Sequence, residues 1–399
     1  MTAISLQGCN IVNLDNGEVL SDTTVFIEKN IIARLQDKRL NLGRVIDLEG
    51  AYLIPGIINV HNNLSIPFPF EEVNPNEPET FTAFRCYTRA LKAVKAGVTT
   101  LRTVGEIHRV DIYLRDLINK GLIEGPTIFA SGKGLGATGG HGAGFGMVEA
   151  DGPDQFLKMA RRELKLGADH LKIFITGGIA KSEEDLTLPQ MTQEEVSATV
   201  KAAHSYRTYV TAHCGGSEAL IEAVEAGVKC FEHGYILNKD AAKSLRENAC
   251  YLVPTLSVTR SPEWMRNNGF DETIIEKALS IKDKHSQSFL KAFNEGVTIV
   301  CGTDLPPGDL NDGVNATVRE IEFMVELGMS HLEALRAATV NAAKLCAADH
   351  YLGRIDVGFQ ASIIALRENP LKDIKTLEQP QLIICKGRMI ENDRYREIL

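Results

Sequence analysis

Five residues whose side chains can bind metal ions or move protons occur at or near the ends of short apolar segments. They are three histidines, a lysine and an aspartate: His61, Lys172, His213, His233 and Asp304. Imidazole and carboxylate groups together suit zinc or a similar divalent ion. These residue types therefore predict a metal site, provided that the fold brings the five segments together.

Each of these residues also has a simpler structural explanation. A single histidine in an apolar strand is more often a hydrogen-bonded core residue than a ligand. Lys172, between Leu171 and Ile173, could be a strand residue whose ammonium group reaches the rim of the fold. Asp304 is followed by Leu305-Pro306-Pro307 and could serve only in a turn. The joint placement on separate segments is what favours a common site.

Short apolar runs alternate with amphipathic stretches through the middle of the chain, a pattern typical of βα units and a parallel sheet. The candidate strands are Gly56–Asn63, Val98–Gly105, Thr127–Gly132, His170–Gly178, Tyr209–Gly215, Lys229–Tyr235, Tyr251–Val258 and Thr298–Leu305. The helical stretches between them include Phe81–Ala96, Asp154–Gly167, Gln193–Ser205, Ser217–Ala226, Asp271–Glu295 and Asn315–Leu327. Eight strands favour an α/β fold with a closed (β/α)8 TIM-type barrel. Active sites lie at the C-terminal rim of such barrels, and the five residues fall on strands one, four, five, six and eight.

Both ends of the chain differ from the middle, because they are rich in short β-forming runs. The first end contains the run Thr24-Val25-Phe26-Ile27, and the last end contains Ala361-Ser362-Ile363-Ile364-Ala365. Neither end has enough apolar surface to fold alone. We therefore expect residues 1–55 and 346–399 to form one small β-sandwich domain beside a barrel of residues 56–345.

Composition and charge argue against several functional classes. The chain is 44% hydrophobic and 24% charged, which is ordinary for a globular protein. A net charge of −9 without a Lys/Arg cluster argues against nucleic-acid binding. No signal peptide is visible in Met1–Val12 and no apolar stretch is long enough to span a bilayer, so we expect a cytoplasmic protein without membrane contact. The eight cysteines show no CxxC spacing, which indicates buried, reduced thiols.

Motifs spread over nearly the whole chain resemble the amidohydrolase superfamily, and within it the prolidase-like or imidazolonepropionase-like branch. The motifs are Leu53-Ile54-Pro55-Gly56-Ile57-Ile58 before His61, Gly97-Val98-Thr99-Thr100, Ser131-Gly132, Thr138-Gly139-Gly140-His141-Gly142, Gly167-Ala168-Asp169-His170-Leu171-Lys172, Ala212-His213, Glu232-His233-Gly234, Gly302-Thr303-Asp304, Glu333-Ala334-Leu335-Arg336-Ala337-Ala338-Thr339, Asn341-Ala342-Ala343, Gly353-Arg354-Ile355 and Asn369-Pro370-Leu371. Agreement at so many separate points makes the resemblance specific for fold and superfamily.

The resemblance implies that carbon dioxide carboxylates Lys172, which then bridges two metal ions. It places His213 and His233 on the more exposed ion, and the strand-one histidines with Asp304 on the buried ion. It further implies that a metal-bound hydroxide attacks the scissile carbonyl while Asp304 passes the proton to the leaving nitrogen. His141 resembles a family residue that hydrogen-bonds the substrate carbonyl; the alternative is a loop histidine among glycines without such a role.

The sequence departs from the family pattern at strand one, where His-x-His is replaced by His61-Asn62-Asn63. An asparagine oxygen is a weak zinc ligand and suits harder ions. Three outcomes are open: one ion held chiefly by Lys172, His213 and His233; two ions, with Asn63 or water completing the buried one; or loss of metal and catalysis. We expect one tightly held zinc and at most a weakly held second ion, because the other liganding residues are present.

The expected function is metal-dependent hydrolysis of an amide (C–N) bond in a small substrate such as a dipeptide, an N-acyl amino acid or a cyclic amide. The loop Ser65–Thr80 follows strand one and either shapes the pocket or is a solvated surface loop. Deamination of an amino-heterocycle is the nearest alternative. A non-catalytic binding protein on a degraded site is the alternative that Asn63 supports. Neither the substrate nor the oligomeric state follows from the sequence, although exposed helical faces on barrels are compatible with a homo-oligomer.

Overall fold

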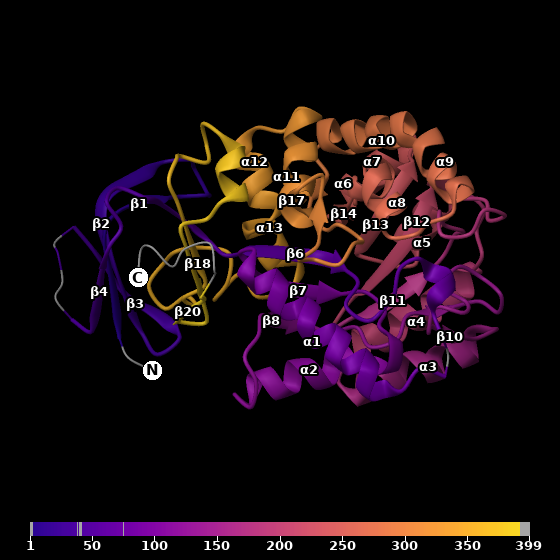
Figure 1. Ribbon diagram of the computed structural model, residues 1–399. Coiled ribbons are helices and arrows are strands. Elements are labelled where there is room, and N and C mark those ends of the chain that lie inside the picture. Colours follow the sequence, from indigo (N-terminus) through magenta and orange to yellow (C-terminus); the bar gives the residue numbers. More distant parts are fainter. Residues whose placement is uncertain (1–2, 38, 40–41, 75, 392–399) are drawn as a thin grey trace.

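The computed structural model describes residues 3–37, 39, 42–74 and 76–391. A β-sheet built from both chain ends lies beside a larger part in which helices surround parallel strands (Figure 1). In the part of the chain that is described, no helix is both long and apolar enough to cross a bilayer. All eight cysteines are buried and free, which confirms the predicted burial of these residues.

One sheet of eight strands joins the two ends of the chain. Its strands are β1 (Ile4–Val12), β2 (Val19–Glu28), β3 (Ile31–Gln36), β4 (Arg44–Asp47), β5 (Tyr52–Pro55), β18 (Ile363–Leu366), β19 (Leu382–Cys385) and β20 (Arg388–Met389). The strand order is β20-β19-β18-β5-β1-β2-β3, and β4 also pairs with β1. Antiparallel pairing of β5 with β18 brings the two ends together, around an apolar cluster that includes Leu6, Val25, Leu53 and Ile363. The described strands of the two ends are connected by hydrogen bonds into one sheet, in which β4 and β5 pair in succession with the same strand, β1.

Parallel strands form the centre of the larger part. One sheet contains β6 (Ile57–Asn62), β7 (Val98–Thr103) and β8 (Thr127–Phe129). The other has the order β10-β9-β11-β12-β13-β14-β15 and consists of β9 (Leu135–Gly136), β10 (Val148–Glu149), β11 (Leu171–Phe174), β12 (Val210–Gly216), β13 (Cys230–Ile236), β14 (Tyr251–Val253) and β15 (Thr298–Ile299). Each predicted strand overlaps one of these, so the α/β architecture with parallel strands is confirmed. Backbone hydrogen bonds also link the two sheets, from Val60 N to Cys301 O (2.9 Å) and from Asp169 N to Ala130 O (2.7 Å).

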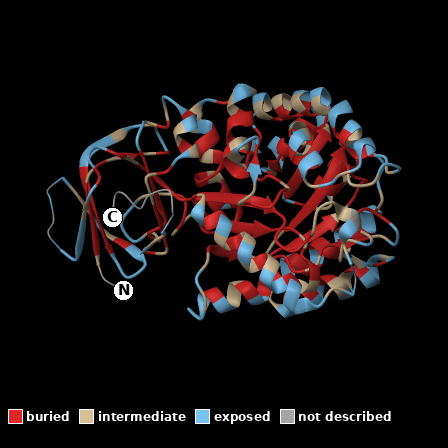
Figure 2. Cartoon of the chain, in the orientation of Figure 1, coloured by how far each residue is buried: buried red, intermediate tan, exposed pale blue. Residues whose placement is uncertain are grey.

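Helices cover the parallel strands, and their outer faces are exposed while the strands are buried (Figure 2). The helices are α1 (Glu79–Lys95), α2 (Val110–Asn119), α3 (Pro153–Leu166), α4 (Gln193–Ser205), α5 (Ser217–Glu225), α6 (Lys239–Glu247), α7 (Ser257–Arg260), α8 (Pro262–Asn267), α9 (Glu272–Ser280), α10 (Lys282–Glu295), α11 (Ala316–Glu326), α12 (His331–Ala337) and α13 (Val340–Leu345). Shorter elements are the 3-10 turns Phe70–Glu72, Ile107–Arg109 and Ile374–Glu378 and the hairpin of β16 (Leu310–Asn311) and β17 (Val314–Asn315). In α3, Phe156, Ala160 and Leu164 are buried at a spacing of four residues, which gives the helix one apolar face.

The helical stretch predicted over Asp271–Glu295 consists of two helices. α9 ends at Ser280 and α10 begins at Lys282. The break at Ile281 lets α9 place Ile274 in the cavity described below, while α10 packs against β13 and α6.

Candidate active site

Every predicted site residue lines one cavity at the C-terminal ends of the parallel strands. They are His61, Asn63, His141, Lys172, His213, His233 and Asp304. The cavity and its open mouth together contain about 960 Å³ of empty space. The strands bring these residues together because β11, β12 and β13 pair in parallel and therefore end on the same side. A parallel bridge between Asn62 and Leu305 joins the end of β6 to the segment of Asp304.

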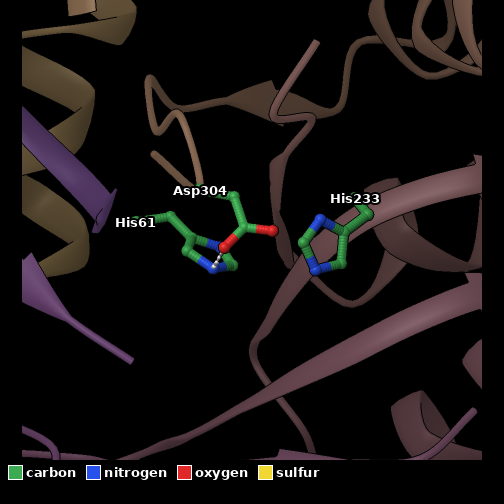
Figure 3. Close-up of side chains that lie close together, drawn as sticks. All are labelled: His61, His233 and Asp304. Carbon is green, nitrogen blue, oxygen red and sulfur yellow. Dashed lines mark ion pairs between the residues drawn. The ribbon is translucent and has the colours of Figure 1, made fainter. Parts of the chain in front are cut away.

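His61 lies between two carboxylates at the floor of the cavity. Its Nδ1 is 2.7 Å from Glu232 Oε2, and its Nε2 is 3.1 Å from Asp304 Oδ1 (Figure 3). Burial alone lowers the pKa of His61, but the charges of Asp304 and Glu232 outweigh it and raise the pKa above its ordinary value. The hydrogen bond to Glu232 orients the ring so that Nε2 faces the cavity side of the site.

A row of imidazole rings extends across the floor. Ring centroids are 5.1 Å apart for His61 and His233, 4.5 Å for His233 and His213, and 4.3 Å for His213 and His141. One ring nitrogen of each central histidine has a protein partner: His233 Nδ1 lies 2.7 Å from Thr255 Oγ1, and His213 Nε2 lies 3.0 Å from Gly177 O. Burial lowers the pKa of both His213 and His233 well below the ordinary value. These rings are therefore neutral, which is the form that binds metal ions.

The donor set fits a divalent ion. His61, His233 and Asp304 each offer one ligand atom, and these atoms lie within 4.8 Å of one another (Figure 3). Lys172 Nζ is buried and has no hydrogen-bond partner among the described residues. It lies 5.1 Å from the centroid of the Phe174 ring, and burial lowers its pKa to about 8. A buried polar atom without a partner is costly, so a ligand or a modification at this amine is the physical expectation.

The backbone is strained at this site. His233 has a φ of 71°, Asp304 a φ of 58° and Thr255 a φ of 49°. Left-handed backbone is uncommon for non-glycine residues and unfavourable for a β-branched one such as threonine. Such positions cluster at functional sites, where the surrounding structure holds a side chain in a required direction.

Two buried charged residues behind the floor were not predicted as part of the site. Arg102 donates from Nη2 to Glu232 Oε1 at 2.5 Å and from Nε to Val60 O at 2.7 Å. Burial alone raises the pKa of Glu232, but Arg102 and His61 hold it well below the ordinary value. Glu232 therefore presents a carboxylate to His61. The available signal was an arginine and a glutamate inside apolar strands, since a fully buried charge needs a partner.

His141 is held by Glu184, which the sequence did not indicate. His141 Nδ1 lies 2.6 Å from Glu184 Oε2, and the same oxygen accepts a hydrogen bond from Gly178 N at 2.8 Å. Although burial alone raises the pKa of Glu184, the hydrogen bond and charge of His141 bring it down to about 2. Glu184 comes from the loop after β11, whose position depends on long-range contacts.

Asn63 lines the cavity, and its side chain is hydrogen-bonded to Asp304, a candidate metal ligand. Its Nδ2 donates to the backbone oxygen and to Oδ1 of Asp304, each at 2.8 Å. It therefore supports Asp304 through a donor group, whereas a metal ligand would have to be its oxygen.

Aromatic side chains form the outer walls of the cavity. The loop predicted over Ser65–Thr80 supplies Phe68 and Phe70, and the segment after β14 supplies Trp264 and Phe270. Phe68 packs edge-on against Trp264 at 5.2 Å between ring centroids, and Phe70 packs against Phe270 at 5.7 Å. The loop therefore contributes to the cavity, as one of its two interpretations predicted.

Two buried glutamates anchor the two wall segments in the same way. Glu106 accepts hydrogen bonds from Leu64 N, Ser65 N and Ser65 Oγ. Glu320 accepts from Leu256 N, Ser257 N and Ser257 Oγ, each at 2.7 Å. Burial raises the pKa of Glu106 and of Glu320 to about 7. In the chain, the anchored residue Ser65 precedes Phe68 and Phe70, and the anchored residue Ser257 precedes Trp264 and Phe270.

Comparison with known proteins agrees with this geometry. The model of the amidohydrolase family matches residues 52–390. Ochratoxinase from Aspergillus niger is 30% identical over 324 residues, which cover 74% of this chain and 66% of ochratoxinase. The chain thus spans about two thirds of the length of this relative.

Solved structures show the same similarity. A Xaa-Pro dipeptidase with methionine bound in its active site is 32% identical with a TM-score of 0.88, over 98% of this chain and 100% of that one. A prolidase complexed with N-methylphosphonate-L-proline is 29% identical with a TM-score of 0.90, over the same shares. Because the family model spans well over half of its residues, the chain belongs to the amidohydrolase family.

Proposed function

We propose that this protein is a metal-dependent hydrolase that cleaves an amide (C–N) bond in a small substrate. Membership of the amidohydrolase family supports a hydrolase, and similarity to a Xaa-Pro dipeptidase and a prolidase supports an amide as the target. The observation that carries the proposal is the buried amine of Lys172, which has no hydrogen-bond partner among the described residues and faces a cavity lined by histidines and Asp304.

The proposed metal is zinc, since the donors are neutral imidazoles and a carboxylate. His61 and Asp304 would hold one position, His213 and His233 the other, and a carboxylated Lys172 would join the two. Because Asn63 replaces a strong donor at the first position, we expect about one zinc per chain to be tightly bound. When bound, such an ion lowers the pKa of water and polarises the substrate carbonyl.

The lowered pKa of Lys172 favours reaction of its amine with carbon dioxide. With its pKa lowered to about 8, a sizeable fraction of the amine is uncharged near neutral pH. Carboxylation forms a bond from Nζ to the carbon of carbon dioxide and releases one proton. The product is a carbamate whose two oxygens would serve as ligands, replacing an amine that otherwise has no partner.

Asp304 is the proposed general base and acid. Burial alone raises the pKa of Asp304, but His61 and Asn63 keep it below the ordinary value, so the carboxylate is ionised at neutral pH. Oδ1 is bound by His61 and Asn63, and Figure 3 shows the other oxygen pointing toward His233. This oxygen would take a proton from the attacking water and deliver it to the leaving nitrogen.

His141 is proposed to hydrogen-bond the carbonyl oxygen of the substrate as negative charge develops on it. Its Nδ1 is committed to Glu184, so the remaining ring nitrogen is the one available to a substrate. A preorganised donor at a developing oxyanion is typically worth a hundredfold or more in rate, on the order of 10²–10³.

The frame of the site is proposed to be a single (β/α)8 barrel of residues 56–345, with residues 1–55 and 346–399 as a second domain. The backbone hydrogen bonds that link the two parallel sheets support this proposal. A common barrel would explain why side chains from β6, β11, β12 and β13 meet at one rim.

The test is an assay of the purified protein, stripped of metal and reloaded with zinc or manganese. Xaa-Pro dipeptides, N-acyl amino acids and cyclic amides serve as substrates, and Lys172→Ala and Asp304→Asn serve as inactive variants. Incubation with ¹³C-labelled bicarbonate should give a carbamate NMR signal in the wild type that Lys172→Ala lacks. Hydrolysis that persists in Asp304→Asn would contradict the assigned role of the carboxylate.

Other outcomes would favour the alternatives. Release of ammonia from amino-heterocycles without cleavage of any amide would favour a deaminase, a class represented by a 22% identical 5-methylthioadenosine/S-adenosylhomocysteine deaminase from Caldicellulosiruptor saccharolyticus. Tight binding without turnover by metal-loaded protein would favour a non-catalytic binding protein.

A further inference from the structure

We infer that the substrate carries a flat apolar group beside its scissile amide and no charged group near that bond. This inference rests on the proposed function and narrows its substrate class. The inferred substrate class therefore distinguishes this chain from a hydrolase that recognises the free amino and carboxyl groups of a dipeptide. The argument uses the walls of the cavity and the charges around it.

The walls form an aromatic box. Phe68 lies 5.2 Å from Trp264 and 5.8 Å from Phe270, measured between ring centroids, and Phe70 lies 5.0 Å from Phe145. These rings come from separate parts of the chain: the loop after β6, the segment containing His141, and the segment of α8 and α9. Rings that meet edge-to-face present both faces and edges, so a planar apolar group of a substrate can stack in the same geometry.

Charged side chains are confined to the floor. Apart from the histidines, the residues that line the cavity include one cation, Lys172, and one anion, Asp304. The proposed function uses both of these groups in the chemistry. The remaining polar lining residues, Asn63, Tyr235 and Ser257, are uncharged. Among the described residues, those that line the upper cavity therefore offer neither an ammonium nor a guanidinium group to a substrate carboxylate.

Three cations outside the described lining, Arg89, Lys181 and Lys277, contact protein groups. The Arg89 guanidinium lies over the Phe68 ring and Lys181 Nζ lies over the Phe145 ring, at 5.6 Å from each centroid. Arg89 donates from Nη1 to three backbone oxygens, of Asn63, Leu64 and Ile66. Lys277 donates from Nζ to the backbone oxygens of three residues in the loop after β11. Lys181 pairs with Glu184 at 3.4 Å.

A carboxylate placed in the upper cavity would therefore lose its hydration without meeting a cation among the described lining residues there. Burial of an unpaired charge is strongly unfavourable, whereas an uncharged ring gains from the same surroundings. The same reasoning applies to a free amino group, because the only carboxylate among the described lining residues is at the floor.

Four compounds test both parts of the inference: N-benzoylpyrrolidine, N-benzoyl-L-proline, N-acetylpyrrolidine and N-acetyl-L-proline. Hydrolysis adds one water, breaks the C–N bond and yields a carboxylic acid and an amine in each case. Zinc-loaded protein should show a kcat/KM for N-benzoylpyrrolidine about tenfold above that for N-acetylpyrrolidine and about tenfold above that for N-benzoyl-L-proline, or about 1.4 kcal/mol for each comparison. Equal or higher values for the proline compounds would overturn the inference.

Binding can be followed without turnover, because Trp264 is the single tryptophan of the chain and lines the cavity. Its fluorescence should report an affinity for N-benzoylpyrrolidine about tenfold higher than for the other three compounds. If none of the four is hydrolysed but this order of affinities holds, the proposed function is in doubt and the inference stands. If hydrolysis occurs with the opposite order, the inference fails and the proposed function stands.

A wall variant identifies the surface that selects the ring. Phe68→Ala should reduce the preference for benzoyl over acetyl by about tenfold while leaving N-acetylpyrrolidine nearly unaffected. The matched control is Phe84→Ala, since Phe84 is a 70% exposed phenylalanine on α1 outside the cavity. An unchanged preference in Phe68→Ala, with the thermal transition intact, would contradict the aromatic box as the selecting surface. The wild-type comparison of the four compounds decides the inference even if this variant fails to fold.

Discussion

Asn63 donates hydrogen bonds from Nδ2 to both the backbone oxygen and Oδ1 of Asp304, and both distances are 2.8 Å. The residue that departs from the family pattern thus supports the proposed general base. The contact also keeps the pKa of Asp304 below its ordinary value, together with the larger effect of His61. Asn63 offers no imidazole to a metal ion, but its amide group donates hydrogen bonds to the neighbouring Asp304.

The first prediction concerns metal content. Asn63→His restores an imidazole donor beside His61 and should raise bound zinc from about one to about two per chain. Elemental analysis after mild chelation measures the change. Asn63→Ala is the control, because it removes the contact with Asp304 without adding a ligand and should leave the tightly held zinc in place. Equal metal content in the wild type and Asn63→His would show that Asn63 does not face a metal position.

The second prediction concerns the buried pair behind His61. Glu232→Gln leaves the guanidinium of Arg102 buried without a counter-charge and should lower the free energy of unfolding by about 3–5 kcal/mol. It should also weaken zinc binding by roughly 10–100-fold, because the orienting partner of His61 is altered. Urea denaturation and a zinc titration measure the two effects.

A double variant separates these two effects. Arg102→Met combined with Glu232→Gln removes the unpaired charge and should recover part of the lost stability, but not the zinc affinity. Recovery of both quantities together would contradict a direct role of Glu232 in orienting His61.

The third prediction concerns the pH dependence of stability. Burial raises the pKa of Glu106 in the folded protein from 4.5 to about 7. A carboxyl group with a raised pKa stabilises the folded state while it is protonated, and this contribution is lost as the pH rises through about 7. A shift of this size corresponds to about 3 kcal/mol. Glu106→Gln removes the titration, so its stability relative to the wild type should rise by up to about 3 kcal/mol between about pH 5 and pH 8.

Comparison at each pH isolates this effect, because the buried histidines titrate equally in both proteins. Glu320→Gln should behave in the same way, since burial raises the pKa of Glu320 to about 7 as well. Glu79→Gln is the control, because the Glu79 side chain is 80% exposed. A difference between Glu106→Gln and the wild type that does not change with pH would refute the assignment.

The fourth prediction concerns the partner of His141. Glu184→Gln replaces the carboxylate that holds Nδ1 of His141 and should lower kcat about tenfold with little change in KM, since the contact acts on the developing oxyanion. Steady-state kinetics on any amide that the protein hydrolyses measures the split. Glu183→Gln is the matched control, because Glu183 is the exposed neighbour. A loss confined to KM would indicate that His141 contributes only to ground-state binding.

Much of the candidate site could be predicted from the sequence because its main residues follow a local rule. Polar residues at the ends of apolar strands lie at one rim wherever the strands are parallel. This rule placed His61, Lys172, His213 and His233 together without knowledge of any contact. The local pattern also indicated a helical stretch over Asp271–Glu295, but not the break at Ile281, which depends on how α9 and α10 pack against different neighbours.

The sequence by itself determined which side chains could perform chemistry and on which strand ends they would lie, because periodicity and strand direction are properties of short segments. Only the tertiary structure decided their partners. Arg102 and Glu232 are 130 positions apart, and Asn63 and Asp304 are 241 positions apart. Such pairs depend on strand register and loop packing, which no local pattern specifies. The hydrogen bonding of Asn63 is therefore decided by Asp304, which follows the last parallel strand in the chain, and not by its place beside His61.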